Sequence, residues 1–153
     1  MTRVEGAVES RIKADSLAAL KAGDKRLVGA LRLYVAALKK ERIDARKDPS
    51  EADELAVLSR ERKRRQESLE TYEAAGRDDL ADQECFELEA LEAYMPAGLS
   101  DDELTVLVDE AVAAAGATSP REMGKVMALL MPQVAGRADG RAVSEAVRAR
   151  LSS

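Results

Sequence analysis

The chain has 153 residues, of which 46% are hydrophobic and 35% charged, with one Phe, three Tyr and no Trp. A core built mainly from Leu, Val, Ala and Met is typical of helical proteins. No apolar stretch reaches the roughly 18 residues of a membrane span, and the charged N-terminal stretch MTRVEGAVESRIKAD lacks the apolar centre of a signal peptide. We therefore expect a cytoplasmic protein of one or two small domains, without a membrane partner.

Missing residue types narrow the chemistry further. The sequence has no histidine and a single cysteine, Cys85, which excludes a Cys–His catalytic pair and a zinc site of Cys and His ligands. No P-loop or GxGxxG string is present. Carboxylate or Ser–Lys chemistry stays open, but no spacing marks it. We expect no catalytic residue, no metal and no cofactor, and we expect Cys85 to be a small core residue.

The charge is unevenly distributed along the chain. The formal net charge is −5, but residues 1–118 hold 18 Lys and Arg against 26 Asp and Glu, whereas residues 119–153 hold six against three. The first segment therefore carries −8 and the second +3. A helical C-terminal segment of opposite sign is a candidate contact surface for an anionic partner. Chance in a short window is the alternative.

Two helices are predicted before Pro49. The first carries apolar residues at steps of about four, namely Val4, Val8, Ile12, Leu17 and Leu20. Gly23 ends this helix and Asp24 caps the second. The second helix has one apolar stripe, formed by Leu27, Leu31, Tyr34, Val35, Leu38 and Ile43.

Two further helices are predicted up to Pro96. Ser50 and Asp53 resemble a capping box at the start of the third helix, roughly 51–75. Two arginines occupy the middle of its apolar stripe, which comprises Leu55, Leu58, Arg62, Arg65, Leu69 and Tyr72. Gly76 ends this helix and Asp78 caps the fourth. The buried face of the fourth helix comprises Leu80, Leu88, Leu91, Tyr94 and Met95.

A fifth helix follows a linker at 95–98. Ser100 and Glu103 form a capping box at its start, and Gly116 stops it. Its inward face is formed by Leu104, Leu107, Val108, Ala111 and Val112.

The last two predicted helices complete a small bundle. Ser119, Pro120 and Glu122 start the sixth helix with a cap, a proline at the first helical position and a box glutamate. Pro132 closes this helix or kinks its last turn. Its inner face comprises Met123, Val126, Met127 and Leu130. The seventh begins near Asp139 and buries Val143, Val147 and Leu151.

These patterns predict an all-α protein, because no strand alternation and no hairpin signal appear anywhere in the sequence. We expect a helical N-terminal domain of about four helices over residues 1–96. A three-helix C-terminal domain is expected over residues 97–153, near the lower size limit for independent folding.

Four stretches of the sequence resemble the YqeY-like family. They are LKAGDKRLVGALRLYVAALKKERID (20–44), ERKRRQESLETYEAAGRDDLADQE (61–84), LEAYMPAGLSDDEL (91–104) and GATSPREMGKVMALLMPQVAGRADGRAVSEAVRARL (116–151). This family is homologous to the tail of the B subunit of the glutamine-dependent aspartyl/glutamyl-tRNA amidotransferase. The link to that tail depends mostly on GKVM (124–127), GRADG (136–140) and the leucine-rich terminal helix.

The resemblance implies an all-α fold and a role in handling tRNA. In the amidotransferase the corresponding tail helps to hold the tRNA, while glutamine hydrolysis and amide formation occur elsewhere. The sequence shows no match to the ATP- and substrate-binding cradle of the B subunit. We therefore expect a non-catalytic module that binds tRNA or a tRNA complex, and the oligomeric state stays open.

Two alternatives remain beside tRNA binding. In the first alternative the protein would be an accessory factor of a carbon–nitrogen ligase with glutamine as amido-N-donor. In the second it would be a protein–protein adaptor without RNA contact. Its partners would then be amidotransferase subunits or other tRNA-handling proteins.

The candidate nucleic-acid contacts lie around the turn before the last helix. Lys125, Arg137 and Arg141 are expected to contact phosphates, and Gly136 and Gly140 would let the backbone approach closely beside the helix N-terminus. A structural interpretation is equally open. In it Gly136 ends a helix, Asp139 is an N-cap that competes with a phosphate, and Gly124 allows close helix packing.

A second basic segment, RERKRR (60–65), follows Lys39, Lys40 and Arg42 on the preceding helix. Such a run is a candidate nucleic-acid patch, but its charges diverge around a helix. Glutamates at 61, 67 and 70 neutralise part of it through i,i+3 pairs. We favour a structural role, in which Arg62 and Arg65 pair with acids such as Asp44 or Glu84.

Overall fold

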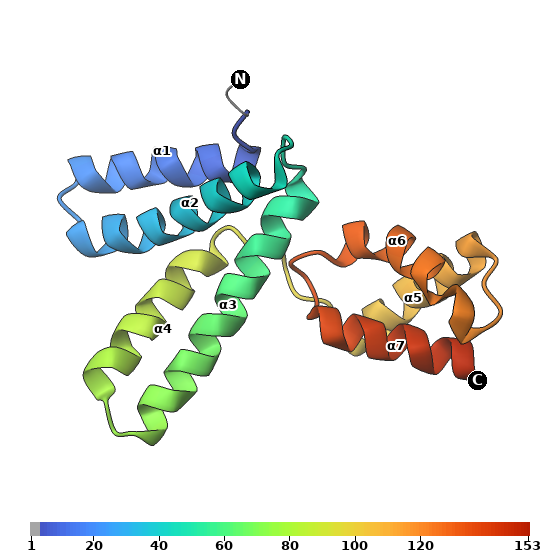
Figure 1. Cartoon of the computed structure of the whole chain (residues 1–153). Coiled ribbons are helices and arrows are strands. Elements are labelled where there is room, and N and C mark those ends of the chain that lie inside the picture. Colours follow the sequence, from blue (N-terminus) through green and yellow to red (C-terminus); the bar gives the residue numbers. More distant parts are fainter. Residues whose placement is uncertain (1–3) are drawn as a thin grey trace. The chain divides into compact units, whose positions relative to one another are not determined.

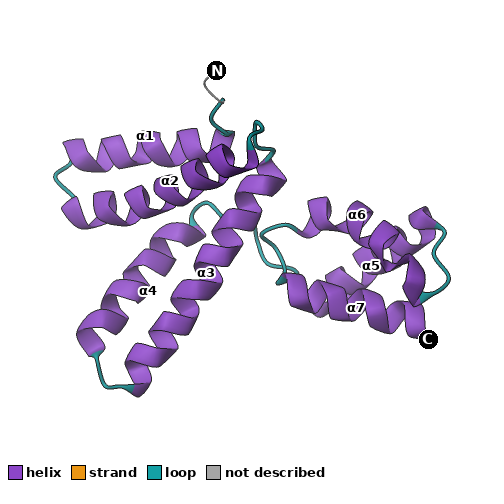
Figure 2. Cartoon of the chain, viewed as in Figure 1, coloured by secondary structure: helices purple, strands orange, loops and turns teal. Residues whose placement is uncertain are grey.

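The computed structural model describes residues 4–153, and every regular element in this range is a helix (Figure 2). The α-helices are α1 (Ala7–Lys21), α2 (Lys25–Ala45), α3 (Glu51–Ala74), α4 (Asp78–Glu92), α5 (Asp101–Ala115), α6 (Met123–Val134) and α7 (Gly140–Ser152), with a 3₁₀ helix η1 (Pro120–Glu122) before α6. The predicted all-α class is confirmed. Within the described range no helix is long and apolar enough to cross a membrane.

The chain divides into two compact units, Met1–Met95 and Pro96–Ser153 (Figure 1). The first unit consists of two helical hairpins, α1–α2 and α3–α4, and α2 packs against both helices of the second hairpin. Its fully buried side chains include Ile12, Leu31, Tyr34, Leu58 and Leu91. The Tyr34 hydroxyl donates a hydrogen bond to the Glu87 carbonyl oxygen at 2.6 Å, which joins α2 to α4.

Helix ends in the first unit follow the sequence signals closely, with one exception. Asp24 accepts a hydrogen bond from the Leu27 N–H at 3.1 Å, and Ser50 with Asp53 forms a complete capping box. Asp78, in contrast, was predicted as a cap and is the first helical residue of α4, whose N-cap position makes no side-chain hydrogen bond.

The apolar stripes predicted for α1 and α2 are partly wrong. Val4, Leu17 and Leu20 are more than half exposed, and the buried residues of α1 are Glu9, Ile12 and Ala19. On α2, Ile43 is 52% exposed, whereas its neighbour Arg42 is buried. Arg42 is turned inward because it pairs with Glu9 of α1.

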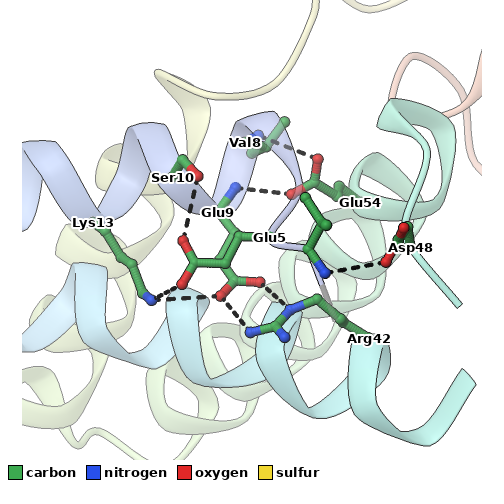
Figure 3. Close-up of polar contacts among 9 residues, drawn as sticks. Glu5, Val8, Glu9, Ser10, Lys13, Arg42, Asp48 and Glu54 are labelled. Atoms are coloured by element: carbon green, nitrogen blue, oxygen red, sulfur yellow. Dashed lines mark hydrogen bonds and ion pairs between the residues drawn. The ribbon is translucent and has the colours of Figure 1, made fainter. Parts of the chain in front are cut away.

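A buried ion pair joins α1 and α2 (Figure 3). The Arg42 Nε and Nη2 atoms each lie 3.0 Å from a different carboxylate oxygen of Glu9. Only 7% of the Arg42 side chain and 1% of the Glu9 side chain are exposed. Removal of either side chain should destabilise the protein, because it leaves the other charge buried without its main partner.

Glu54 of α3 caps the start of α1 (Figure 3). Its carboxylate accepts hydrogen bonds from the backbone N–H of Val8 at 3.2 Å and of Glu9 at 2.8 Å. These donors have no partner within their own helix, and a negative charge is favourable at that end. Glu54 is buried, with 3% of the residue exposed. Because Glu54 accepts from these N–H groups, a side chain of the other hairpin takes the role that an N-cap side chain usually has.

Gly6 makes this approach possible. It holds the N-cap position of α1 with an ordinary φ of −72°, so it is not required for its backbone conformation. A Cβ atom at this position would overlap the Glu54 carboxylate. Glycine at position 6 is therefore explained by the lack of room for a Cβ atom beside Glu54, and not by its backbone conformation.

Cys85 does not lie in the core, as was predicted, but is exposed on α4. The inward side of α4 instead contains Ala81, Glu87 and Leu91. Glu87 is drawn inward by Arg65 of α3, whose Nη1 lies 2.7 Å from it. This rotates Cys85 toward solvent.

In the second unit, α5, α6 and α7 each pack against the other two. The core includes Val108, Val112, Val126, Leu130, Val134, Val143, Val147 and Leu151. The capping box of Ser100 and Glu103 is confirmed, and Gly116 ends α5 with a φ of +64°. The three residues predicted to be buried in the last helix are confirmed.

The start of α6 differs from the prediction. Ser119 makes no side-chain capping hydrogen bond, and a turn of 3₁₀ helix precedes the α-helix. The Glu122 carboxylate accepts a hydrogen bond from the Thr118 N–H, which lowers the pKa of Glu122. Pro132 lies inside α6, and the helix continues to Val134.

We predict that Gly6→Ala destabilises the first unit by about 1–3 kcal/mol, because the added methyl group displaces the Glu54 cap. Gly29→Ala is the control, since Gly29 lies in α2 with open space around it. That change should stabilise the protein by about 0.5–1 kcal/mol through helix propensity. Urea unfolding followed by circular dichroism measures both. Equal stability of Gly6→Ala and the unchanged protein would contradict the close approach of Glu54.

Candidate nucleic-acid interface

The turn between α6 and α7 is built by its glycine and by backbone hydrogen bonds. Gly136 follows the end of α6 with a φ of +75°, a conformation that glycine adopts without strain. The N–H groups of Arg137 and Ala138 then donate to the Val134 carbonyl oxygen at 2.9 and 3.2 Å. Gly136 is buried. It therefore has the helix-ending role of the structural interpretation, which needs no ligand.

Arg137 connects this turn to the beginning of the unit. Its Nε donates to the Ala97 carbonyl oxygen at 3.1 Å, and its own carbonyl oxygen accepts from the Leu99 N–H at 2.9 Å. Its Nη2 lies 3.9 Å from Glu103 Oε2, and 34% of the side chain is exposed. Arg137 thus holds residues 97–99 against the turn through its Nε–H and its backbone carbonyl oxygen.

Asp139 and the first residues of α7 differ from both interpretations. Asp139 holds the N-cap position, but its side chain makes no capping hydrogen bond. It therefore does not compete for the N–H groups in the way expected of a capping aspartate. Gly140 is exposed, and a Cβ atom there would meet open space. Gly124 is equally open, so the expectation that it permits close helix packing is wrong.

Lys125 and Arg141 are both exposed but lie at different places. Lys125 is on the first turn of α6, about 14 Å along the helix axis from Val134 at the other end. Arg141 is on the first turn of α7, and its Nε lies 3.2 Å from Glu145 Oε1. The five predicted contact residues therefore do not form one cluster. Gly136, Arg137, Gly140 and Arg141 are near the α6–α7 turn, whereas Lys125 is at the far end of α6.

Charge in the second unit is separated between helices. The α5 helix carries five acidic residues and no basic one: Asp101, Asp102, Glu103, Asp109 and Glu110. All six Lys and Arg residues of the unit lie after α5, in residues 121–150. The positive charge of this unit is therefore carried by the segment of η1, α6 and α7, and α5 carries only negative charge.

Ion pairing divides the six cations into two groups. Arg137, Arg141 and Arg150 each lie within 4 Å of a carboxylate, and Arg150 Nε is 2.7 Å from Asp109 Oδ1. For Arg121, Lys125 and Arg148, the described part of the chain contains no carboxylate at ion-pair distance. All three residues are exposed.

The basic run 60–65 serves mainly the packing of the first unit. Arg65 contacts two helices. Its Nη1 lies 2.7 Å from Glu87 and 3.6 Å from Glu84, and its Nη2 lies 3.3 Å from Glu61. Its guanidinium also covers the Tyr34 ring.

The predicted pairing of Arg65 with Glu84 is confirmed. The proposed partner Asp44 is wrong, because Asp44 pairs with Lys40 within α2.

Other members of the run also bridge helices. Arg62 pairs with Glu92 of α4 at 3.1 Å, and Arg60 with Glu41 of α2 at 3.2 Å. Lys63 and Arg64 are exposed, without a carboxylate at ion-pair distance among residues 4–153. Three of the five basic residues therefore hold α3 to its neighbours, which agrees with the structural interpretation.

A cavity of about 320 Å³ lies between the second half of α2 and the first half of α3. Its lining includes the apolar side chains of Leu38 and Val57. Two ion pairs lie at the cavity, Arg60 with Glu41 at 3.2 Å and Lys47 with Asp53 at 3.5 Å. Because these charges neutralise one another, the cavity does not present a group of one sign to a ligand.

These features define an all-helical protein of two small units with a cationic side on the second. Within the described range no group of three His, Cys, Asp or Glu side chains is arranged to hold a metal ion. A family model described as Yqey-like protein matches residues 9–151, nearly the whole chain. The chain belongs to the YqeY-like family. A search of curated proteins found no match.

We predict that Arg65→Met destabilises the first unit by about 2–4 kcal/mol, because it leaves Glu87 and Glu84 poorly compensated in a largely buried position. Arg64→Met is the matched control. It removes the same charge from an exposed neighbour and should change the free energy of unfolding by less than about 0.5 kcal/mol. Urea unfolding compares the two. If Arg64→Met is the more damaging change, the structural role of this run is wrong.

Proposed function

We propose that this protein is a non-catalytic helical module that binds tRNA, or a complex that contains tRNA, through its C-terminal unit. The observation that carries the proposal is the group of exposed cations Arg121, Lys125 and Arg148, for which the described residues provide no ion pair. Phosphate contacts of this kind supply most of the affinity of nucleic-acid binding.

The family supports the same proposal. YqeY-like proteins are homologous to the tail of the amidotransferase B subunit, a region that helps to hold tRNA in that enzyme. The stretches that carry this likeness, 124–127 and 136–140, border α6 at its two ends. Gly136 and Arg137 serve the fold there, so Lys125 and Arg141 are the predicted contacts from that set that can reach a ligand without disturbing the turn.

Composition favours a structured RNA over an unpaired strand. Residues 96–153 contain no Phe, Tyr or Trp, so the C-terminal unit has no aromatic side chain on which an unpaired base can stack. A folded RNA is recognised largely through phosphates and 2′-hydroxyl groups, which cations and small polar residues contact without stacking. This agrees with tRNA as the partner class.

The test is binding of the purified full chain to total tRNA at about 50 and 200 mM salt. Affinity should fall steeply with salt, and the Lys125→Ala, Arg141→Ala double variant should reduce the slope of log affinity against log salt by about two. Its control is Lys63→Ala, Arg64→Ala, which removes two exposed cations from the first unit and should leave the slope unchanged. Circular dichroism checks that both variants remain folded.

Absence of binding at 50 mM salt would refute the RNA proposal. The alternatives then give different results in a pull-down. An accessory factor of a carbon–nitrogen ligase with glutamine as amido-N-donor would retain amidotransferase subunits. An adaptor would retain another tRNA-handling protein, through a contact that is insensitive to salt.

A further inference from the structure

We infer that the centre of the RNA contact is the outward face of α7, formed by Arg141 and Arg148 and extended by Arg121 of η1, and not the glycine-containing turn. This inference rests on the proposed function and names the surface that performs it. Arg148 and Arg121 were not among the residues that the sequence motifs indicated.

The turn is a poor contact site because its polar groups already serve the fold. Arg137 donates to the Ala97 carbonyl oxygen and accepts from Leu99, and Gly136 is buried. A phosphate that took the Nε–H of Arg137 would have to break the contact that holds residues 97–99 in place. The α7 face requires no such rearrangement.

Helix geometry places the two arginines of α7 on one face. Arg141 and Arg148 are seven residues apart, close to two full turns, so their side chains point in nearly the same direction about 10 Å apart along the axis. Both residues are exposed, and 80% of the Arg141 side chain is accessible. The buried residues Val143, Val147 and Leu151 lie on a different face of α7, centred about 110° around the helix from the two arginines.

Arg150 shows which way this face points. Its Nε lies 2.7 Å from Asp109 on α5, so that side of α7 adjoins the acidic helix. Arg148 is two residues earlier and is therefore rotated by about 200° around the helix. The Arg141–Arg148 face is thus directed away from the Asp109 carboxylate of α5.

Arg121 is an exposed cation of the element that contacts α7. A turn of five residues joins α6 to α7, so α7 runs back along α6 (Figure 1). It also contacts η1, the 3₁₀ turn that precedes α6 and contains Arg121. The C-terminal half of α7, with Arg148, lies toward this end. A folded RNA lying along α7 would therefore meet cations at both ends of the helix.

Glu145 is the one acidic residue on this face. It lies between the two arginines and pairs with Arg141 at 3.2 Å, with 62% of its side chain exposed. It weakens the attraction of the face for phosphate. Removal of its charge should therefore strengthen RNA binding, an effect that a merely structural role of the face would not produce.

The experiment compares three single variants of the full chain with total tRNA over a salt series. Arg148→Gln should weaken binding several-fold and lower the salt slope by about one. Arg150→Gln removes the same charge two residues away and should leave the slope unchanged. Glu145→Gln should raise affinity about two- to five-fold, the range that an exposed charge interaction produces.

Equal effects of Arg148→Gln and Arg150→Gln, with no gain from Glu145→Gln, would overturn the α7 surface while leaving tRNA binding itself intact. Failure of the unchanged protein to bind tRNA would instead overturn the proposed function. Circular dichroism of each variant confirms that altered binding does not reflect unfolding.

Discussion

Ion pairs between neighbouring helices determine both how the first unit packs and which cations of the second unit remain available. The contact between Arg42 and Glu9 is almost completely buried, and it orients α1 and α2 with a charged residue of each turned inward. Glu54 then approaches the start of α1 so closely that a Cβ atom at position 6 would overlap its carboxylate. Arg65 plays a similar part between α3 and α4. Removal of one partner leaves the charge of the other buried, so substitution of any of these residues should destabilise the first unit.

The same pairing explains where the sequence was informative and where it was not. Helix number and class followed from apolar periodicity, and most helix ends followed from glycines and capping boxes, because these signals are local. The buried faces of α1 and α2 were predicted only in part: Ile12, Leu31, Tyr34 and Leu38 are buried as expected, but the inward positions of Glu9 and Arg42 were missed because their pairing connects residues 33 positions apart. No local pattern shows that two charged residues neutralise each other in a core. Cys85 was misplaced for the same reason, since Arg65 draws Glu87 inward and turns the cysteine outward.

The candidate interface could also be predicted only in part from the sequence. The sequence indicated the C-terminal segment through its charge and its motifs, and in the structure all six cations of that unit follow α5 in the chain, two of them paired with its carboxylates. It did not indicate that Arg137 is engaged by Ala97 and Glu103, because that contact crosses the unit. Nor did it single out Arg148, which belongs to no motif and becomes notable only because its neighbour Arg150 is paired with Asp109. A helical wheel of α7 alone would have placed Arg141 and Arg148 together, which is the signal that was available.

The central claim is that tRNA contacts the exposed cations of η1, α6 and α7 in the second unit, whereas the basic run 60–65 mainly holds helices together in the first unit. The most direct measurement is nuclear magnetic resonance of the isotope-labelled full chain during titration with tRNA. The account predicts that shift changes and line broadening concentrate at Arg121, Lys125, Arg141 and Arg148, with α5 and the run 60–65 unchanged. Changes centred on Lys63 and Arg64, or on the acidic face of α5, would contradict it.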